Sequence, residues 1–129
     1  MILIDTSAWG EFFRDRAPVA SLVDEALANG EAAVCGPIET EIRRGLLNQR
    51  ERRKVLPLLQ GCHWLSTPEN LWFEAGELGY ALRRRGVTPK TFDLLIATHA
   101  LAHDVALLTR DRDFRHMSDA GIAIRLIDS

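Results

Sequence analysis

Cysteine, lysine and long apolar stretches are scarce in this sequence of 129 residues, and each scarcity excludes a class of protein. The two cysteines, Cys35 and Cys62, stand far apart without a C-x-x-C spacing, so we expect two reduced thiols. No apolar stretch approaches the roughly 18 residues that cross a bilayer, and the N-terminus lacks the regions of a signal peptide. We therefore expect a cytoplasmic protein without a disulfide framework or a membrane partner.

The composition is that of one ordinary globular domain. Apolar residues make up 47% and charged residues 26%, and this length can bury a single core without help from disulfides. The net charge of -2 gives no indication of a nucleic-acid partner, but fourteen of the sixteen basic residues are Arg, many of them in short runs. We expect a single domain over residues 1–129.

Four short apolar runs separated by helix-like segments predict a mostly parallel sheet. These runs cover residues 1–4, 32–35, 105–109 and 122–128, and residues 63–66 are a weaker candidate for a fifth strand. The fold class predicted from this alternation is α/β, with helices on both faces of a twisted sheet of four or five strands.

The helix boundaries are read from capping residues, prolines and glycines. Ser7 is expected to cap a first helix, and either Thr88 or Thr91 a later one that precedes the third strand. A helix starts at Pro37, in whose first turn proline is tolerated, whereas Pro57 is expected to kink or restart the next helix.

Acidic side chains follow two of the predicted strands. Asp5 comes directly after the first strand, and Asp111 comes two residues after the third, with Asp113 close behind. Asp93 falls in the first turn of the helix that leads into that third strand, where an anion is well tolerated. The carboxyl ends of parallel strands form one edge of a sheet, so we expect these acids to converge.

The helix after the second strand offers one more acid. Ile38, Ile42 and Leu46 define its buried stripe, and Glu39 and Glu41 both flank that stripe. Helical geometry alone does not choose between the two.

Converging carboxylates need a counter-charge. Two unit charges about 4 Å apart repel by roughly 4 kcal/mol at the effective dielectric of a protein surface. Oxygen ligands without His or Cys nearby favour Mg²⁺ or Mn²⁺, and an ion held in this way suits phosphodiester hydrolysis. A single Asp after a strand is more often a turn or cap residue, but several in register favour a metal site.

Five segments of the chain, in order, resemble the PIN-domain ribonucleases, specifically the VapC-type toxins of bacterial toxin–antitoxin pairs. They are ILIDTSAW, ETEIRRG, FDLLIATHALAHD, LLTRDRDF and GIAIRLID. The likeness covers essentially the whole chain and implies a three-layer PIN-like domain over residues 1–129. It also selects Glu41, because the family's acid precedes an aliphatic residue with Gly, here Gly45, four positions on.

The resemblance implies specific roles for the acids and their neighbours. The implied catalytic and metal-binding set is Asp5, Glu41, Asp93 and Asp111, with Asp113 as a candidate fifth member. From its position at the start of a helix, Asp113 is equally a candidate helix cap. Asp5 and Asp93 are the first choice for direct ligands of Mg²⁺ or Mn²⁺. Thr6 and Thr109 are expected to orient carboxylates by hydrogen bonding.

The same resemblance implies a metal-dependent endoribonuclease that acts as a toxin. Its implied partners are an RNA substrate, a second copy in a homodimer, and a small antitoxin that blocks the active-site groove. The alternative is a catalytically silent module of the same fold that binds only RNA or antitoxin. A phosphoacceptor signalling domain is disfavoured, because it needs a Lys near the last strand and the only lysines are Lys54 and Lys90.

Other residues carry weaker signals. Among the basic runs, Arg43 and Arg44 are the best candidates for RNA-backbone contacts because they share the helix of Glu41. His99 and His103 have i, i+4 spacing but no further ligand, so partly buried positions are favoured over zinc. For the aromatic residues we favour the core or a subunit contact over base stacking; these are Trp9, Phe12, Phe13, Trp72 and Phe73.

Overall fold

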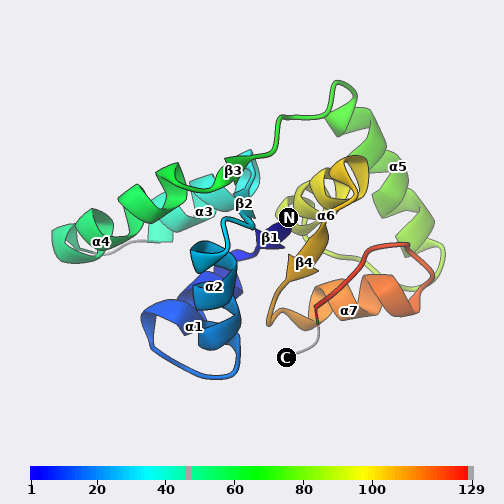
Figure 1. The fold of residues 1–129 in the computed structure, drawn as a ribbon. Coiled ribbons are helices and arrows are strands. Elements are labelled where there is room, and N and C mark those ends of the chain that lie inside the picture. Colours follow the sequence, from blue (N-terminus) through cyan, green and yellow to red (C-terminus); the bar gives the residue numbers. More distant parts are fainter. Residues whose placement is uncertain (46–47, 128–129) are drawn as a thin grey trace.

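The computed structural model describes residues 1–45 and 48–127, and these form an α/β domain around a parallel sheet (Figure 1). The strands are β1 (Ile2–Ile4), β2 (Ala32–Val34), β3 (His63–Trp64) and β4 (Ala106–Leu108), in the order β3-β2-β1-β4. The weak strand candidate at residues 63–66 is thus confirmed as β3, but only over His63–Trp64. Strand order reverses between β1 and β4, and the carboxyl ends of strands at such a point form the crevice where α/β proteins bind ligands.

Helices fill the connections between the strands. They are α1 (Thr6–Phe13), α2 (Val19–Ala28), α3 (Gly36–Gly45), α4 (Gln49–Gln60), α5 (Leu71–Arg83), α6 (Thr91–His103) and α7 (Arg112–Asp119). Figure 1 shows the α1–α2 pair on one side of the sheet and the α5–α6 pair on the other. The predicted three-layer arrangement with helices on both faces is therefore confirmed.

Residues of β1, β4 and α6 belong to one hydrophobic core cluster. Leu3, Ile4, Leu107 and Leu108 are buried on the two strands, and α6 is buried continuously from Leu95 to Ala100. A helix that is apolar nearly all round is expected to be enclosed by other elements. Enclosure on this scale fixes the first turn of α6, which carries Asp93.

Gly79 lies at the contact between α5 and α6. A Cβ atom added at Gly79 would lie 2.9 Å from Cδ1 of Leu94, closer than real side chains approach. Gly79 therefore lets the two helices pack directly against each other beside the first turn of α6.

Several predicted helix boundaries are wrong. Asp5, not Ser7, occupies the N-cap position of α1, because the helix begins one residue before Ser7. Lys90 occupies the N-cap position of α6 and makes no side-chain cap, so neither Thr88 nor Thr91 has that role. Pro57 lies inside a continuous α4.

The predicted strand over residues 122–128 is also wrong in its described part. Over residues 122–127 the pairing with β4 is confined to an isolated parallel bridge between Leu126 and Leu107. The backbone N–H of Leu107 donates to the carbonyl of Arg125 and that of Ile127 donates to the carbonyl of Leu107. Two bonds to a single residue of β4 do not make a continuous ladder. Residue 128 lies outside the described residues.

The aromatic side chains divide into two groups. Trp9 is fully buried, and Phe12 and Phe13 pack against the core, as predicted. Trp72 and Phe73 are 75% and 69% exposed on α5, so a place in the core is wrong for both. Residues 71, 75 and 82 occupy the inner face of α5 at helical spacing, so Phe73 lies opposite this buried stripe and Trp72 lies on its flank.

The remaining predictions of burial concern His99, His103 and the thiols. His99 is fully buried with Nδ1 bonded to the carbonyl of Leu95, and Nε2 of His103 bonds the carbonyl of Ser66. Cys35 and Cys62 are free thiols. None of the helices in the described part of the chain is long and apolar enough to span a membrane.

Candidate active site

Asp5 is a buried carboxylate held by two hydroxyl groups at the end of β1. It is 5% exposed, and its Oδ2 accepts hydrogen bonds from Ser7 Oγ at 2.9 Å and Thr109 Oγ1 at 2.7 Å. Burial raises the pKa of Asp5, although these hydrogen bonds oppose the rise. The two hydroxyl groups thus fix the orientation of the Asp5 carboxylate without fully compensating for its burial.

Thr109 connects Asp5 to the start of α7. Its Oγ1 donates to Asp5 and accepts a hydrogen bond from the backbone N–H of Asp111 at 3.0 Å. Oδ1 of Asp111 in turn accepts from the backbone N–H of Asp113 at 2.9 Å and so caps α7. Because Asp111 is the cap, the alternative cap role for Asp113 is wrong.

Asp93 is a buried carboxylate with several other carboxylates nearby. It is 7% exposed, and its Oδ2 is buried without a hydrogen-bond partner among the described residues. Burial raises the pKa of Asp93 to about 7, and repulsion by the neighbouring carboxylates adds to the rise; these are Asp111, Asp5, Asp113 and Glu41. An unpartnered buried carboxylate oxygen is costly unless another group neutralises it.

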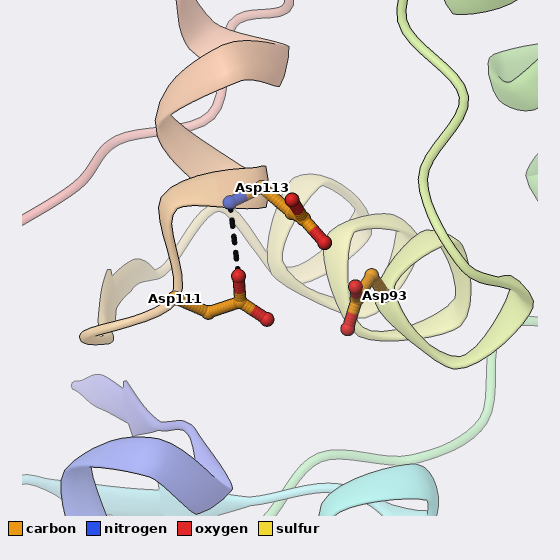
Figure 2. A group of neighbouring side chains, drawn as sticks. All are labelled: Asp93, Asp111 and Asp113. Atoms are coloured by element: carbon orange, nitrogen blue, oxygen red, sulfur yellow. Dashed lines mark hydrogen bonds between the residues drawn. The ribbon is translucent and has the colours of Figure 1, made fainter.

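Three of the acids are close enough to share an ion. Asp93, Asp111 and Asp113 each place a carboxylate oxygen within 4.8 Å of the others, and Figure 2 shows them converging from α6 and the start of α7. Oxygen ligands of one Mg²⁺ lie about 2.1 Å from it, hence at most about 4.2 Å apart. Small side-chain adjustments would therefore bring these oxygens onto a single ion, so the residues fit a hard dication.

Glu41 approaches the site from α3. Its Oε1 accepts a hydrogen bond from Thr6 Oγ1 at 2.9 Å. Burial is the main cause that raises the pKa of Glu41; repulsion by Asp5 and Asp111 adds to it, and attraction by Arg44 opposes it. Asp5 and Glu41 are not members of the three-acid group, but both act on Asp93 through their charge.

The structure places the two predicted arginines differently. Nη2 of Arg43 lies 3.6 Å from Oε1 of Glu39, one turn earlier on the exposed side of α3. Arg44 is exposed and lowers the pKa of Glu41. Of the pair, Arg44 is thus the one coupled to the acidic site.

Sequence reasoning missed the contact that Ser7 makes. Ser7 Oγ donates to Asp5 and accepts from the backbone N–H of Arg110 at 2.9 Å, so it joins α1 to the loop after β4. The signal was present, since a hydroxyl two residues after a strand-end Asp can bond it locally. It was instead interpreted as a helix cap.

Comparison with known proteins assigns the family. Residues 2–120 match the PIN domain model. The chain is 38% identical over 119 residues to the VapC ribonuclease Mb1587 of Mycobacterium bovis, and equally to ribonuclease VapC11 of Mycobacterium tuberculosis. These matches cover 88% of this chain and 89% of each relative. The chain belongs to the PIN-domain family, and its relatives within it are VapC-type ribonucleases.

Solved structures agree on the fold. VapBC2 of Rickettsia felis, bound to a promoter DNA fragment, superposes with a TM-score of 0.76 at 20% identity, covering 98% of both chains. The DNA-bound VapBC of Salmonella typhimurium gives 0.77 at 17% identity, covering 98% of this chain and 96% of that one. FitAcB of Neisseria gonorrhoeae gives 0.73 at 21% identity, covering 99% and 97%.

Proposed function

We propose that this protein is a Mg²⁺- or Mn²⁺-dependent endoribonuclease and the toxin of a toxin–antitoxin pair. The single observation that carries the proposal is the buried, unpartnered Oδ2 of Asp93 inside a group of three converging carboxylates. Without a counter-charge, three converging carboxylates destabilise the fold, and a bound dication would remove this cost. The ribonuclease names of relatives 38% identical over most of the chain support RNA as the substrate.

The proposed division of labour assigns a role to each acid. Asp93, Asp111 and Asp113 hold the ion, and Asp5 completes the site from the end of β1. A bound dication would supply positive charge to the scissile phosphate and a water of lowered pKa. Glu41, oriented by Thr6, is placed to position the attacking water or accept its proton.

Induced expression in bacteria tests the proposal directly. The intact protein is expected to create new RNA 5′ ends at defined positions, whereas Asp5→Asn is expected to create none, because the substitution removes the charge at the end of β1. Sequencing of RNA 5′ ends provides the measurement, and the variant's yield and melting temperature control for folding. New ends of equal abundance in the variant would contradict the proposal.

Thr109 is proposed as a positioning residue for Asp5 and Asp111. Thr109→Val keeps the shape but removes the donor to Asp5 and the acceptor for the Asp111 N–H, and we expect roughly 10- to 100-fold slower cleavage. The midpoint of a metal titration should rise in parallel, which a purely structural defect would not cause. Thr40→Val, at an exposed position on α3, is the matched control and should leave both unchanged.

A small antitoxin is the proposed protein partner, and the cytoplasm the proposed compartment. A solved structure of similar fold from Klebsiella pneumoniae is a toxin–antitoxin complex. Two free thiols, Cys35 and Cys62, suit a reducing compartment.

A homodimer through α5 is the last part of the proposal. Trp72, Phe73 and Tyr80 are 75%, 69% and 59% exposed on one face of this helix, and exposed aromatic surface of this extent indicates an interface. Charges of opposite sign also follow one another along α5: Glu74 and Glu77 lie in its first two turns, and Arg83 ends the helix with Arg84 at its C-cap. A second copy packed antiparallel about a two-fold axis would bring unlike charges together.

The oligomeric state tests the α5 interface. Trp72→Ser combined with Phe73→Ser removes two large apolar contacts per subunit, and we expect dimer affinity to fall at least roughly 100-fold. Light scattering on a size-exclusion column measures the mass. Leu101→Ser, at an exposed apolar position on α6, should remain dimeric. A monomeric wild-type protein, or an unaffected α5 variant, would rule out this interface.

A further inference from the structure

A hollow whose lining includes three arginines lies directly beside the acidic site. Its volume is about 430 Å³. The residues that line it come from the loop after β4, the first turn of α7 and the C-terminal segment: Thr109, Arg110, Asp111, Arg112, Arg115, Leu126 and Ile127. Thr109 and Asp111 belong to both the hollow and the acidic site. An extended ligand bound in the hollow would therefore reach the acidic site.

The loop that carries these arginines is fixed relative to the acids. The backbone N–H of Arg110 donates to Ser7 Oγ at 2.9 Å, and that of Asp111 donates to Thr109 Oγ1 at 3.0 Å. Both hydroxyls also donate to Oδ2 of Asp5. The same hydrogen bonds that orient Asp5 therefore set the distance from the acids to the basic hollow.

Two of the arginines in the lining carry a charge that no carboxylate of the described residues pairs directly. The side chains of Arg110 and Arg112 are exposed, and neither forms an ion pair within residues 1–45 and 48–127. Arg112 is also the first residue of α7, where the positive end of the helix dipole disfavours a cation. By contrast, Arg125 on the C-terminal segment is paired with Asp104 at 3.3 Å.

We infer that this hollow binds a backbone phosphate of single-stranded RNA adjacent to the scissile one, through Arg110 and Arg112. The inference rests on the proposed ribonuclease function. Five carboxylates carry more negative charge than one dication cancels, so a polyanion needs further cations close by. The planar guanidinium matches phosphate oxygens in two-point hydrogen bonds. Because phosphates carry no sequence information, these contacts add affinity rather than choice of target.

The salt dependence of RNA binding tests the inference. The probe is a short fluorescent single-stranded RNA with Mg²⁺ present, and every protein carries Asp93→Asn to prevent cleavage. Each phosphate contact to a single strand contributes about 0.7 to the slope of log affinity against log salt. Because the two arginines bind one phosphate, Arg110→Gln with Arg112→Gln should lower the magnitude of the slope by about 0.7, as measured by fluorescence anisotropy over a range of KCl concentrations.

A second readout separates binding from chemistry. In the otherwise intact enzyme, the double variant should raise KM roughly 10-fold with kcat nearly unchanged, which is the signature of lost uniform binding. Arg50→Gln with Arg53→Gln is the charge-matched control, since both lie exposed on α4, far from α7 in Figure 1. This control should keep the slope and the KM of the intact protein.

The outcomes distinguish this inference from the function on which it rests. An unchanged slope in the Arg110/Arg112 variant, or an equal loss in both double variants, overturns the phosphate site while the ribonuclease stands. A wild-type protein that neither binds nor cleaves RNA overturns both. Melting temperatures equal to that of the intact protein exclude misfolding as the cause of a reduced slope.

Discussion

Asp93→Asn is expected to abolish metal-dependent RNA cleavage and, at the same time, to stabilise the metal-free protein above pH 7. Asn keeps the size of the side chain but removes a charge that the fold buries with an unpartnered oxygen, Oδ2, and surrounds with other carboxylates. Loss of a metal ligand should reduce cleavage by at least roughly 100-fold. A gain in stability from the same substitution is the trade-off expected where a site is built for function.

The sign of the stability effect follows from the pKa. Burial, aided by the neighbouring acids, raises the pKa of Asp93 to about 7 from the ordinary value of 3.8. Between these two pH values the folded protein holds a proton that the unfolded chain has released. The free energy of unfolding therefore falls as pH rises from 4 to 7, by at most roughly 4 kcal/mol, and stays low above pH 7. The Asp93→Asn variant should not show this loss of unfolding free energy as pH rises.

Urea unfolding of both proteins in EDTA, at pH 5 and pH 8, measures the effect. The variant should exceed the wild type at pH 8 and lose most of that advantage at pH 5. Asp24→Asn, at an exposed position on α2, controls for the change in net charge. A variant that cleaves RNA at the wild-type rate, or that is less stable than wild type at pH 8, would contradict the assignment of Asp93.

The strand-end acids were predictable because their positions follow from topology alone. A carboxylate after a buried parallel strand must lie at the carboxyl edge of the sheet, and Asp5 and Asp111 do so wherever the helices pack. The position of Asp93 was equally predictable, because the first turn of a helix that leads into such a strand lies near the carboxyl ends of the neighbouring strands. Glu41 needed the resemblance, since both it and Glu39 satisfy the helical pattern.

Local hydrogen bonds and surface exposure were not predictable in the same way. A cap role for Ser7 or Asp113 depended on where α1 and α7 begin, and each role would have required its helix to start two residues later than it does. Trp72 and Phe73 are large aromatic residues of the kind found in cores, and they are exposed because α5 packs through the face that carries Leu71, Ala75 and Leu82. Such choices depend on tertiary contacts that a local pattern does not contain.

Mg²⁺ or Mn²⁺ is expected to raise the melting temperature strongly at pH 8 and hardly at all at pH 5. At pH 8 Asp93 is ionised and is repelled by the neighbouring carboxylates, so an ion that binds only the folded site relieves the repulsion. At pH 5 Asp93, with a pKa of about 7, holds a proton that must leave before the ion can bind. Protons and metal thus compete for the same oxygens.

The size of the shift follows from mass action. An ion at about 100 times its dissociation constant adds roughly 2.7 kcal/mol to the free energy of unfolding, which for a domain of this size is roughly 10 °C. Differential scanning fluorimetry with and without metal, at both pH values and matched ionic strength, gives the measurement. Asp93→Asn should lose most of the shift at pH 8, whereas Asp24→Asn should keep it. Equal shifts at both pH values would mean that the ion binds elsewhere, because a site with Asp93 as a ligand must release its proton first.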